Sequence, residues 1–307
     1  MGIDKIGIVG MGSLGMLFGS LLVDALGQDA VIFIMDQERK NKYNGIIRKV
    51  NGKPYPFQIV SCQDPKILVD VLIFAVKGTG LNDAMALAKN WVGEKTTLIS
   101  LLNGITSEQV IGEQFGHNKV LYAVAEGMDP VIIGEDMTYT NSGYLRIGTD
   151  TLENGKKERL DQLLALFESI GFPYKKEEDV RHRLWSKFML NVGVNQVVMV
   201  YEGTYGTIQK TGEARDLMIE AMKEVIPLAQ KEGVAINEQD LWFYVELVDT
   251  LNPQGMPSMR QDSLYGKKTE VEMFSGKVLE LGEKHGMATP INSKIYEKIN
   301  KMERLIQ

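Results

Sequence analysis

The sequence predicts an α/β amino-terminal domain with a doubly wound parallel sheet, followed by an all-helical carboxyl-terminal domain. The first observation is an apolar segment, Ile6 to Val9, that leads directly into a glycine-rich turn. The second is the alternation of short apolar segments with helical stretches over roughly the first 150 residues, which is typical of a parallel sheet with crossover helices. The third is a change after residue 178, beyond which helical periodicity dominates.

The glycine-rich turn has the form G-x-G-x-x-G. Gly10 allows a tight turn, Gly12 lets the backbone approach a pyrophosphate, and Gly15 lets the next helix pack closely on the strand. A phosphate would then lie at a helix N-terminus, where free N–H groups and the helix dipole favour an anion. Glycines also mark ordinary turns, but the strand before and the helix after favour a Rossmann dinucleotide site. Its expected residues are Gly10, Met11, Gly12, Ser13, Leu14 and Gly15.

The remaining sheet is predicted from apolar segments, several of which are apolar throughout, as expected for strands buried on both faces. These segments are Ile6–Val9, Val31–Met35, Val71–Val76, Thr97–Leu102 and Val120–Ala125. A further strand is expected at Tyr144–Ile147. It precedes an amphipathic helix over Lys156–Ile170, which Gly171 and Pro173 end.

A charged segment, Lys175–Asp179, is the best candidate boundary, so we expect domains over residues 1–178 and 179–307. Helical periodicity in the second domain covers 180–202, 212–232, 237–251 and 266–285. Gly233 and Gly286 resemble C-cap glycines, and Pro227 is expected to kink its helix. A ligand is expected in the cleft between the two domains, outside the carboxyl ends of the strands.

Composition narrows the function classes. The chain has 307 residues, a net charge of −6 and a pI near 5.3, which argues against a nucleic-acid partner. No apolar stretch is long enough to span a membrane, and no signal peptide is apparent. Cys62 is the only cysteine, so we expect no intrachain disulfide and a reducing cytoplasm. The three histidines lack zinc-ligand spacing, and no metal site is expected.

An acidic residue, Asp36, closes the segment Val31–Met35 at the place where a carboxylate would hold the adenosine ribose hydroxyls. It is also a suitable helix N-cap, and one residue can do both. A 2′-phosphate beside it would meet repulsion of about 4 kcal/mol per charge at ~4 Å and an effective dielectric constant near 20. Arg39, Lys40 and Lys42 would each offset only about 0–1 kcal/mol if exposed. The residues therefore favour NADH over NADPH.

Polar residues follow two further predicted strands. Lys77 comes directly after Val71–Val76, and Asn103 with Gly104 follows Thr97–Leu102. Such residues project from the carboxyl edge of the sheet, where nicotinamide and substrate should lie. Lys77 could equally be an exposed loop lysine, and Asn-Gly also favours an ordinary turn.

A polar stripe interrupts an otherwise apolar helix in the second domain. Lys187, Asn191 and Asn195 recur every fourth position and so share one helix face. This face either meets solvent or lines a cavity, because burying unpaired amides and an ammonium is costly. Two asparagines have no helix-propensity reason to be there, which favours a cavity.

Ketone reduction needs a hydride donor, a proton donor for the developing alkoxide and groups that hold the substrate. The ammonium of Lys187 would supply the proton and electrostatic stabilisation, since no histidine has a comparable setting. Glu270 could bond the substrate hydroxyl or the nicotinamide ribose and anchor Lys187. Its segment, Thr269–Glu272, is also compatible with a solvated acidic turn.

Taken together, these residues resemble the ketopantoate reductase (2-dehydropantoate 2-reductase) family over nearly the whole chain. The order and spacing of the motifs are specific, although each motif alone is weak. They are Gly10-x-Gly12-x-x-Gly15, Lys77, Asn103-Gly104, Lys187-x-x-x-Asn191-x-x-x-Asn195, Pro257-Ser258-Met259-x-Gln261-Asp262 and Thr269-Glu270.

The resemblance implies that Lys187 is the general acid and that Asn191, Asn195 and Ser258 contact the substrate. It also implies that Lys77, Asn103 and Glu270 contact the cofactor or the ternary complex, with Glu270 counted among the catalytic residues. The implied reaction is NADPH-dependent reduction of 2-dehydropantoate to (R)-pantoate, on the route to pantothenate and coenzyme A. The expected partner is a small 2-keto acid, and the expected assembly is a homodimer.

Three positions depart from the family pattern. Family members often have a basic residue where Asp36 stands, and asparagines are common at the places of Tyr205 and Gly255. An alternative is therefore an NADH-dependent D-2-hydroxyacid dehydrogenase acting on other branched 2-keto acids on the same scaffold. A non-catalytic dinucleotide-binding sensor is a remote alternative, because Lys187 and Glu270 are both present.

Overall fold

The computed structural model describes residues 2–306, and the chain forms two compact units. Unit 1 comprises the chain up to Leu102 together with Thr106–Arg181, and unit 2 comprises Asn103–Ile105 together with the chain from His182 onward. The division falls in the first turn of helix α6 (Val180–Val200), a few residues beyond the expected boundary. The short segment Asn103–Ile105 thus belongs to unit 2, although it follows a strand of unit 1 in the sequence.

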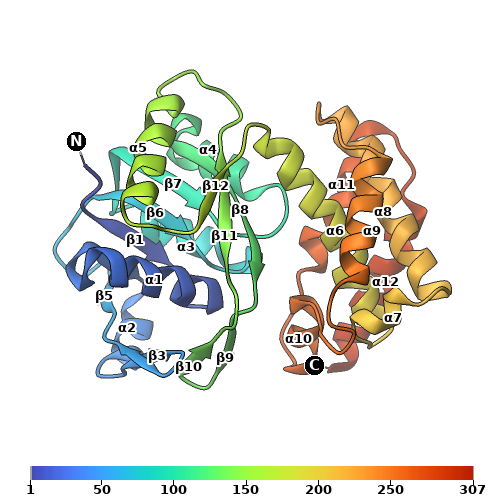
Figure 1. Cartoon of the computed structure of the whole chain (residues 1–307), viewed down its shortest axis with the longest axis horizontal. Coiled ribbons are helices and arrows are strands. Elements are labelled where there is room, and N and C mark those ends of the chain that lie inside the picture. Colours follow the sequence, from blue (N-terminus) through green and yellow to red (C-terminus); the bar gives the residue numbers. More distant parts are fainter. Residues whose placement is uncertain (1, 307) are drawn as a thin grey trace. The chain divides into compact units, whose positions relative to one another are not determined.

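Unit 1 is built on an eight-stranded sheet (Figure 1). In spatial order its strands are β12 (Tyr174–Lys176), β11 (Ser142–Gly148), β8 (Val120–Met128), β7 (Val92–Ser100), β6 (Val69–Phe74), β1 (Ile6–Val9), β2 (Val31–Ile34) and β5 (Gln58–Val60). Neighbouring strands are parallel except β8 and β11. The chain moves outward from β1 through β2 to β5 and then returns to β6, so the switch point lies between β1 and β6.

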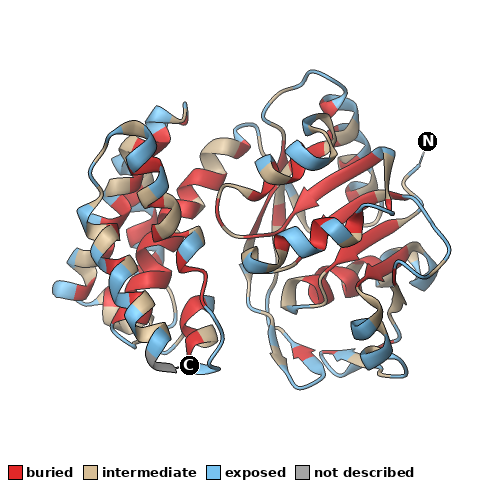
Figure 2. Cartoon of the chain, turned by 180° about the vertical axis from the view of Figure 1, so that it is seen from behind, coloured by how far each residue is buried: buried red, intermediate tan, exposed pale blue. Residues whose placement is uncertain are grey.

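Helices connect these strands and cover the sheet of unit 1. They are α1 (Ser13–Leu26), α2 (Gln37–Tyr43), α3 (Leu81–Ala88), α4 (Ser107–Phe115) and α5 (Lys156–Ser169). The central strands are buried, as Figure 2 shows, which agrees with their uninterrupted apolar sequences. Phe18 of α1 packs near Phe172, whose ring stacks on Phe167 of α5 at 4.3 Å between centroids. The two helices therefore share one part of the core.

A second sheet of unit 1 was not expected. Its strands are β4 (Lys53–Tyr55), β3 (Arg48–Val50), β10 (Asp136–Thr138) and β9 (Val131–Ile133). Each strand is only three residues long, which is too short for an apolar period to distinguish it in the sequence. Val50, Tyr55 and Met137 pack with Met16 and Leu17 of α1, which anchors this sheet to the rest of unit 1.

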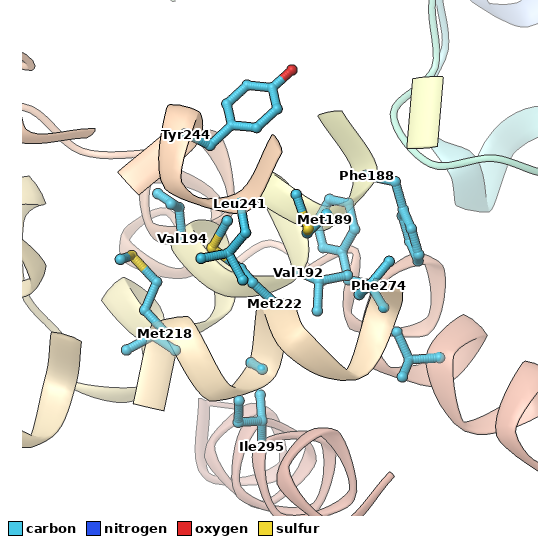
Figure 3. Packing of buried hydrophobic residues seen from close by; sticks show 14 of the residues in the cluster. Phe188, Met189, Val192, Val194, Met218, Met222, Leu241, Tyr244, Phe274 and Ile295 are labelled. Atoms are coloured by element: carbon cyan, nitrogen blue, oxygen red, sulfur yellow. The ribbon is translucent and has the colours of Figure 1, made fainter. Parts of the chain in front are cut away.

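Unit 2 is helical. Besides α6 it contains α7 (Tyr205–Gln209), α8 (Glu213–Lys231), α9 (Glu238–Asp249), α10 (Ser258–Leu264), the 3₁₀ turn η4 (Val271–Met273), α11 (Ser275–His285) and α12 (Pro290–Ile306). Every residue from 191 to 200 in α6 is buried. Figure 3 shows α6 side chains such as Phe188 and Val192 packed with Met222 and Phe274. A core around one central helix explains why α6 is apolar on most faces.

The expected single helix over 266–285 is wrong in its first part. Gly266 has φ +63° and ends α10, and α11 begins only at Ser275. Gly233 and Gly286 do adopt left-handed conformations after α8 and α11, as expected. Pro227 lies inside α8, which continues to Lys231. Within residues 2–306, no helix combines the length and the apolarity that crossing a membrane requires.

Candidate active site

The turn between β1 and α1 has the geometry of a phosphate cradle. Gly10 has φ +108°, and a Cβ there would lie 2.5 Å from the carbonyl oxygen of Ala75, at the end of β6. A Cβ at Gly15 would lie 2.0 Å from the carbonyl oxygen of Gly10, so α1 can pass this close to the turn only without a side chain. Around Gly12, by contrast, a Cβ would meet nothing within 4 Å.

This open position is also the N-cap of α1, where no side chain caps the helix. The first turn of α1 therefore presents backbone N–H groups beside open space at the switch point of the sheet. Such an arrangement suits the pyrophosphate of a dinucleotide. Met11, Ser13 and Leu14 are half-buried around the same turn, so the residues present fit the cofactor that the motif predicts.

At the end of β2, Asp36 caps α2, because its Oδ1 accepts a hydrogen bond from the backbone N–H of Arg39 at 2.7 Å. Its Oδ2 lies 3.4 Å from Nε of Arg39, and its side chain is 41% exposed. The capping role expected for Asp36 is thus present, and a carboxylate oxygen remains accessible to solvent. Its contact with a ribose remains a prediction. At the end of β6, Lys77 is exposed and precedes the 3₁₀ turn η2 (Gly78–Gly80), and its contact with a cofactor also remains a prediction.

In unit 2, the polar stripe on α6 is not a solvated helix face. Asn191 and Asn195 are only 8% and 7% exposed, and Lys187 is half-buried. The Nδ2 atom of Asn191 is buried and has no hydrogen-bond partner. On the opposite side of the helix, a Cβ at Gly193 would lie 2.5 Å from the side chain of Met222, so this side is packed tightly against α8. A buried amide donor without a partner costs stability, which is typical of a site that binds a ligand.

A series of buried hydrogen bonds, which the sequence analysis did not predict, holds α6 in place. Gln196 donates from Nε2 to the carbonyl oxygen of Val192, and its Oε1 accepts the N–H of Ser275 at the start of α11. Ser275 in turn bonds Asn292 of α12, and Asn292 bonds Glu224 of α8. A polar residue such as Gln196, next to Asn195 in an otherwise apolar helix, is the sequence feature that could have indicated these hydrogen bonds. Its bonds fix the helix that presents the stripe.

Residues 167 positions apart meet at the next part of the site. Nδ2 of Asn103 donates to Oε2 of Glu270 at 3.3 Å. Glu270 is only 8% exposed, so the interpretation of this segment as a solvated acidic turn is wrong for Glu270. The N–H and the hydroxyl of the preceding residue, Thr269, both donate hydrogen bonds to the carboxylate of Glu303. Gly104, with φ +93°, lets the chain approach Met273 closely.

The remaining predicted contact, Ser258, is exposed as the first residue of α10. Two of the three departures from the family pattern, Tyr205 and Gly255, lie in contact with each other near this helix. The N–H of Tyr205 donates to the carbonyl oxygen of Gly255 at 2.9 Å, and a Cβ at Gly255 would lie 3.0 Å from the Tyr205 ring. Burial raises the pKa of the Tyr205 hydroxyl. The aromatic ring thus lies where the missing side chain of residue 255 would begin.

A glycine turn that suits a dinucleotide, together with half-buried Lys187 and buried Asn191 and Asn195 on one helix face, indicates a dinucleotide-dependent oxidoreductase. Two family models match the chain, "Ketopantoate reductase PanE/ApbA" over residues 6–136 and "Ketopantoate reductase PanE/ApbA C terminal" over residues 179–303. The chain belongs to the ketopantoate reductase family. Members of this family bind NAD(P) and reduce 2-keto acids.

Individual proteins show the same relationship. The chain is 27% identical to 2-dehydropantoate 2-reductase of Aquifex aeolicus, with 96% of each chain covered, and 25% identical to that of Pyrococcus abyssi, with 98% covered. Among solved structures it matches a dimeric ketopantoate reductase from Staphylococcus aureus (TM-score 0.82, 19% identity, 99% and 100% covered). It also matches a D-mandelate dehydrogenase with NADH and anilino(oxo)acetate (TM-score 0.86, 21% identity, 98% and 99% covered). The similarity to these two solved structures establishes the fold of the chain.

Proposed function

We propose that the protein reduces 2-dehydropantoate to (R)-pantoate by hydride transfer from NAD(P)H, a step toward pantothenate and coenzyme A. The observation that supports this most is the buried, unpartnered amide of Asn191 on the face of α6 that also bears Lys187 and Asn195. In this proposal, a substrate oxygen accepts the hydrogen bond that this donor lacks. The full-length similarity to several 2-dehydropantoate 2-reductases supports this choice of substrate.

In the proposed reaction, the turn of Gly10, Gly12 and Gly15 would hold NAD(P)H, which when bound would supply a hydride to the keto carbon. The ammonium of Lys187 donates its proton to the carbonyl oxygen as negative charge develops there, and the carbon–oxygen double bond becomes an alcohol. Asn191, Asn195 and Ser258 hold the substrate oxygens. Glu270 is fixed by its buried setting and by Asn103, so its carboxylate is positioned to accept a hydrogen bond from a hydroxyl group.

For the cofactor, we propose that NADH is used at least as well as NADPH. Asp36 presents an accessible carboxylate oxygen at the end of β2, where an adenosine ribose is expected. A ribose hydroxyl can donate to this oxygen, whereas a 2′-phosphate would be repelled by it.

A second candidate, reduction of other branched or aromatic 2-keto acids to D-2-hydroxy acids, is favoured by Tyr205 and Gly255. An aromatic ring and a missing side chain replace two amides, so this region offers fewer hydrogen-bonding groups and more apolar surface. In a region with few hydrogen-bonding groups, an apolar substrate substituent would lose less binding free energy than the hydroxyl of 2-dehydropantoate.

Steady-state rates with each cofactor distinguish these candidates. We expect the highest kcat/KM with 2-dehydropantoate when a panel also contains 2-ketoisovalerate, 2-ketoisocaproate and phenylglyoxylate. A higher kcat/KM with one of the other keto acids establishes the second candidate instead. No turnover of any 2-keto acid, with intact NADH binding, contradicts both and supports a sensor.

A further inference from the structure

An ion pair lies beside the residue proposed to select the cofactor. Strands β2 and β5 are parallel neighbours, with Ile34 opposite Val60, so Asp36 and Ser61 leave the sheet at the same edge. Ser61 begins a turn in which Asp64 donates its N–H to the carbonyl oxygen of Ser61 at 3.0 Å. The turn after β5 and the residue after β2 therefore border the same expected adenosine site.

Within this turn, Asp64 holds Lys40 with both carboxylate oxygens. Nζ of Lys40 lies 2.5 Å from Oδ1 and 2.6 Å from Oδ2. The side chains are only 29% and 27% exposed, so water screens this pair less than a pair on the open surface. Oδ2 also accepts the N–H of Ser61 at 2.6 Å. The Lys40 ammonium and this N–H hold the pKa of the Asp64 carboxyl below its usual value.

Lys40 starts close to Asp36, because its own N–H donates to the carbonyl oxygen of Asp36 at 2.9 Å. Among the cations that follow β2, Arg39 is paired with the Asp36 carboxylate itself, and Lys42 is exposed on α2. Lys40 is thus a cation one helical turn beyond the ribose-selecting carboxylate, yet its ammonium is directed to Asp64.

We propose that Asp64 is a positioning residue for cofactor choice: by holding Lys40, it withholds a cation from an adenosine 2′-phosphate and strengthens discrimination against NADPH. This inference rests on the proposed adenosine site at Asp36. A 2′-phosphate placed there is repelled by the Asp36 carboxylate, and it gains Lys40 only if the ion pair with Asp64 breaks. NADH has only hydroxyl groups at this position, so its binding does not require the Lys40 ammonium.

The test is calorimetric titration of the full chain with NADH and with NADPH, without any keto acid. In Asp64→Asn, Lys40 is released, and the Kd for NADPH should fall about tenfold, which corresponds to one charge-assisted contact of ~1.4 kcal/mol. The Kd for NADH should change less than twofold. Asp64→Glu keeps the charge and should retain the wild-type ratio of the two constants.

The decisive control is the double variant Asp64→Asn/Lys40→Ala, in which the gain for NADPH should disappear. Lys40→Ala alone should not improve NADPH binding, since the ion pair already withholds this lysine and the Asp64 carboxylate stays charged. Asp64→Ala provides a second route to releasing Lys40 if Asp64→Asn does not fold.

Two results would overturn the inference: an equal change for both cofactors in the Asp64 variants, or a gain for NADPH that persists without Lys40. Failure of the proposed function is seen separately. Lack of keto acid turnover leaves these binding constants unaffected, and a wild-type preference for NADPH contradicts the role of Asp36 without altering the Lys40-dependent shift.

Discussion

The candidate site of unit 1 is formed by the backbone, whereas that of unit 2 is formed by side chains. In unit 1 the turn depends on the absence of side chains at three glycines. Gly12 leaves open space, and Gly10 and Gly15 allow close approaches of the backbone. In unit 2 the site is made of polar side chains on a buried helix, among them Asn191 and Asn195. A backbone site needs only a short local motif, whereas a side-chain site needs a surrounding core that directs it. The predictions below test this difference.

The largest effect is expected at Lys187. Lys187→Ala should lower kcat by roughly 10²- to 10⁴-fold, as is typical when a general acid is lost. Lys187→Arg should restore little activity, because a guanidinium keeps the charge but does not release its proton near neutral pH. Steady-state kinetics check both variants.

A control for Lys187 is the binding of NADH, which we propose that unit 1 provides and which should therefore persist in both variants. Near-normal kcat in Lys187→Ala would contradict the assignment and direct attention to Lys77 or to a water molecule held by Glu270.

In unit 1, a buried acid predicts a dependence of stability on pH. Glu108 of α4 is 2% exposed, its Oε1 has no partner, and Ser107 donates to its Oε2. Burial raises its pKa from 4.5 to about 7. The folded protein therefore holds a proton that the unfolded chain has lost, so the free energy of unfolding should fall as the pH rises from about 4.5 to about 7. At ~1.4 kcal/mol per pKa unit, the total is about 3 kcal/mol.

Urea unfolding of the wild type and of Glu108→Gln between pH 5 and pH 8 measures this contribution. Gln cannot ionise, so the variant should lose this part of the pH dependence and be the more stable protein at pH 8. An identical pH dependence in both proteins would show that Glu108 is ionised in the fold at pH 5.

The glycine cradle allows a matched pair of variants. Gly15→Ala should destabilise unit 1 by about 1–3 kcal/mol, because its Cβ would press on the carbonyl oxygen of Gly10. Gly12→Ala adds the same methyl group into open space and should leave the free energy of unfolding nearly unchanged, while NADH binding weakens. Thermal unfolding and NADH titration separate the two effects. If Gly12→Ala bound NADH normally, the pyrophosphate would not lie at this position.

The sequence predicted local features better than contacts between distant segments, for the same physical reason. The glycine motif and the acid after β2 are local features, and the structure gives them a turn, an open position and a capped helix. The contact of Asn103 with Glu270 joins segments 167 residues apart, which no local pattern encodes. The three-residue strands of the second sheet and the non-helical segment after Gly266 were missed because tertiary contacts, rather than periodicity, determine them.

The smallest changes in kinetics and stability are expected for two amide side chains on α6. Asn191 has an unpartnered buried amide, whereas the amide of Gln196 is bonded at both ends, to Val192 and Ser275. Removing an unpaired donor costs little, so Asn191→Ala should keep the free energy of unfolding within about 1 kcal/mol of the wild type. It should nevertheless raise KM for the keto acid about tenfold, the effect of one lost substrate hydrogen bond.

Gln196→Ala should show the reverse: a loss of about 1–3 kcal/mol in stability, because the N–H of Ser275 loses its partner, with a smaller change in KM. Asn195→Ala should follow Asn191→Ala in its kinetics, and NADH binding should be unchanged in both. The comparison needs chemical unfolding and steady-state kinetics on the same preparations. If Asn191→Ala lowered stability as much as Gln196→Ala and left KM unchanged, the amide of Asn191 would have a structural partner and the stripe would not bind substrate.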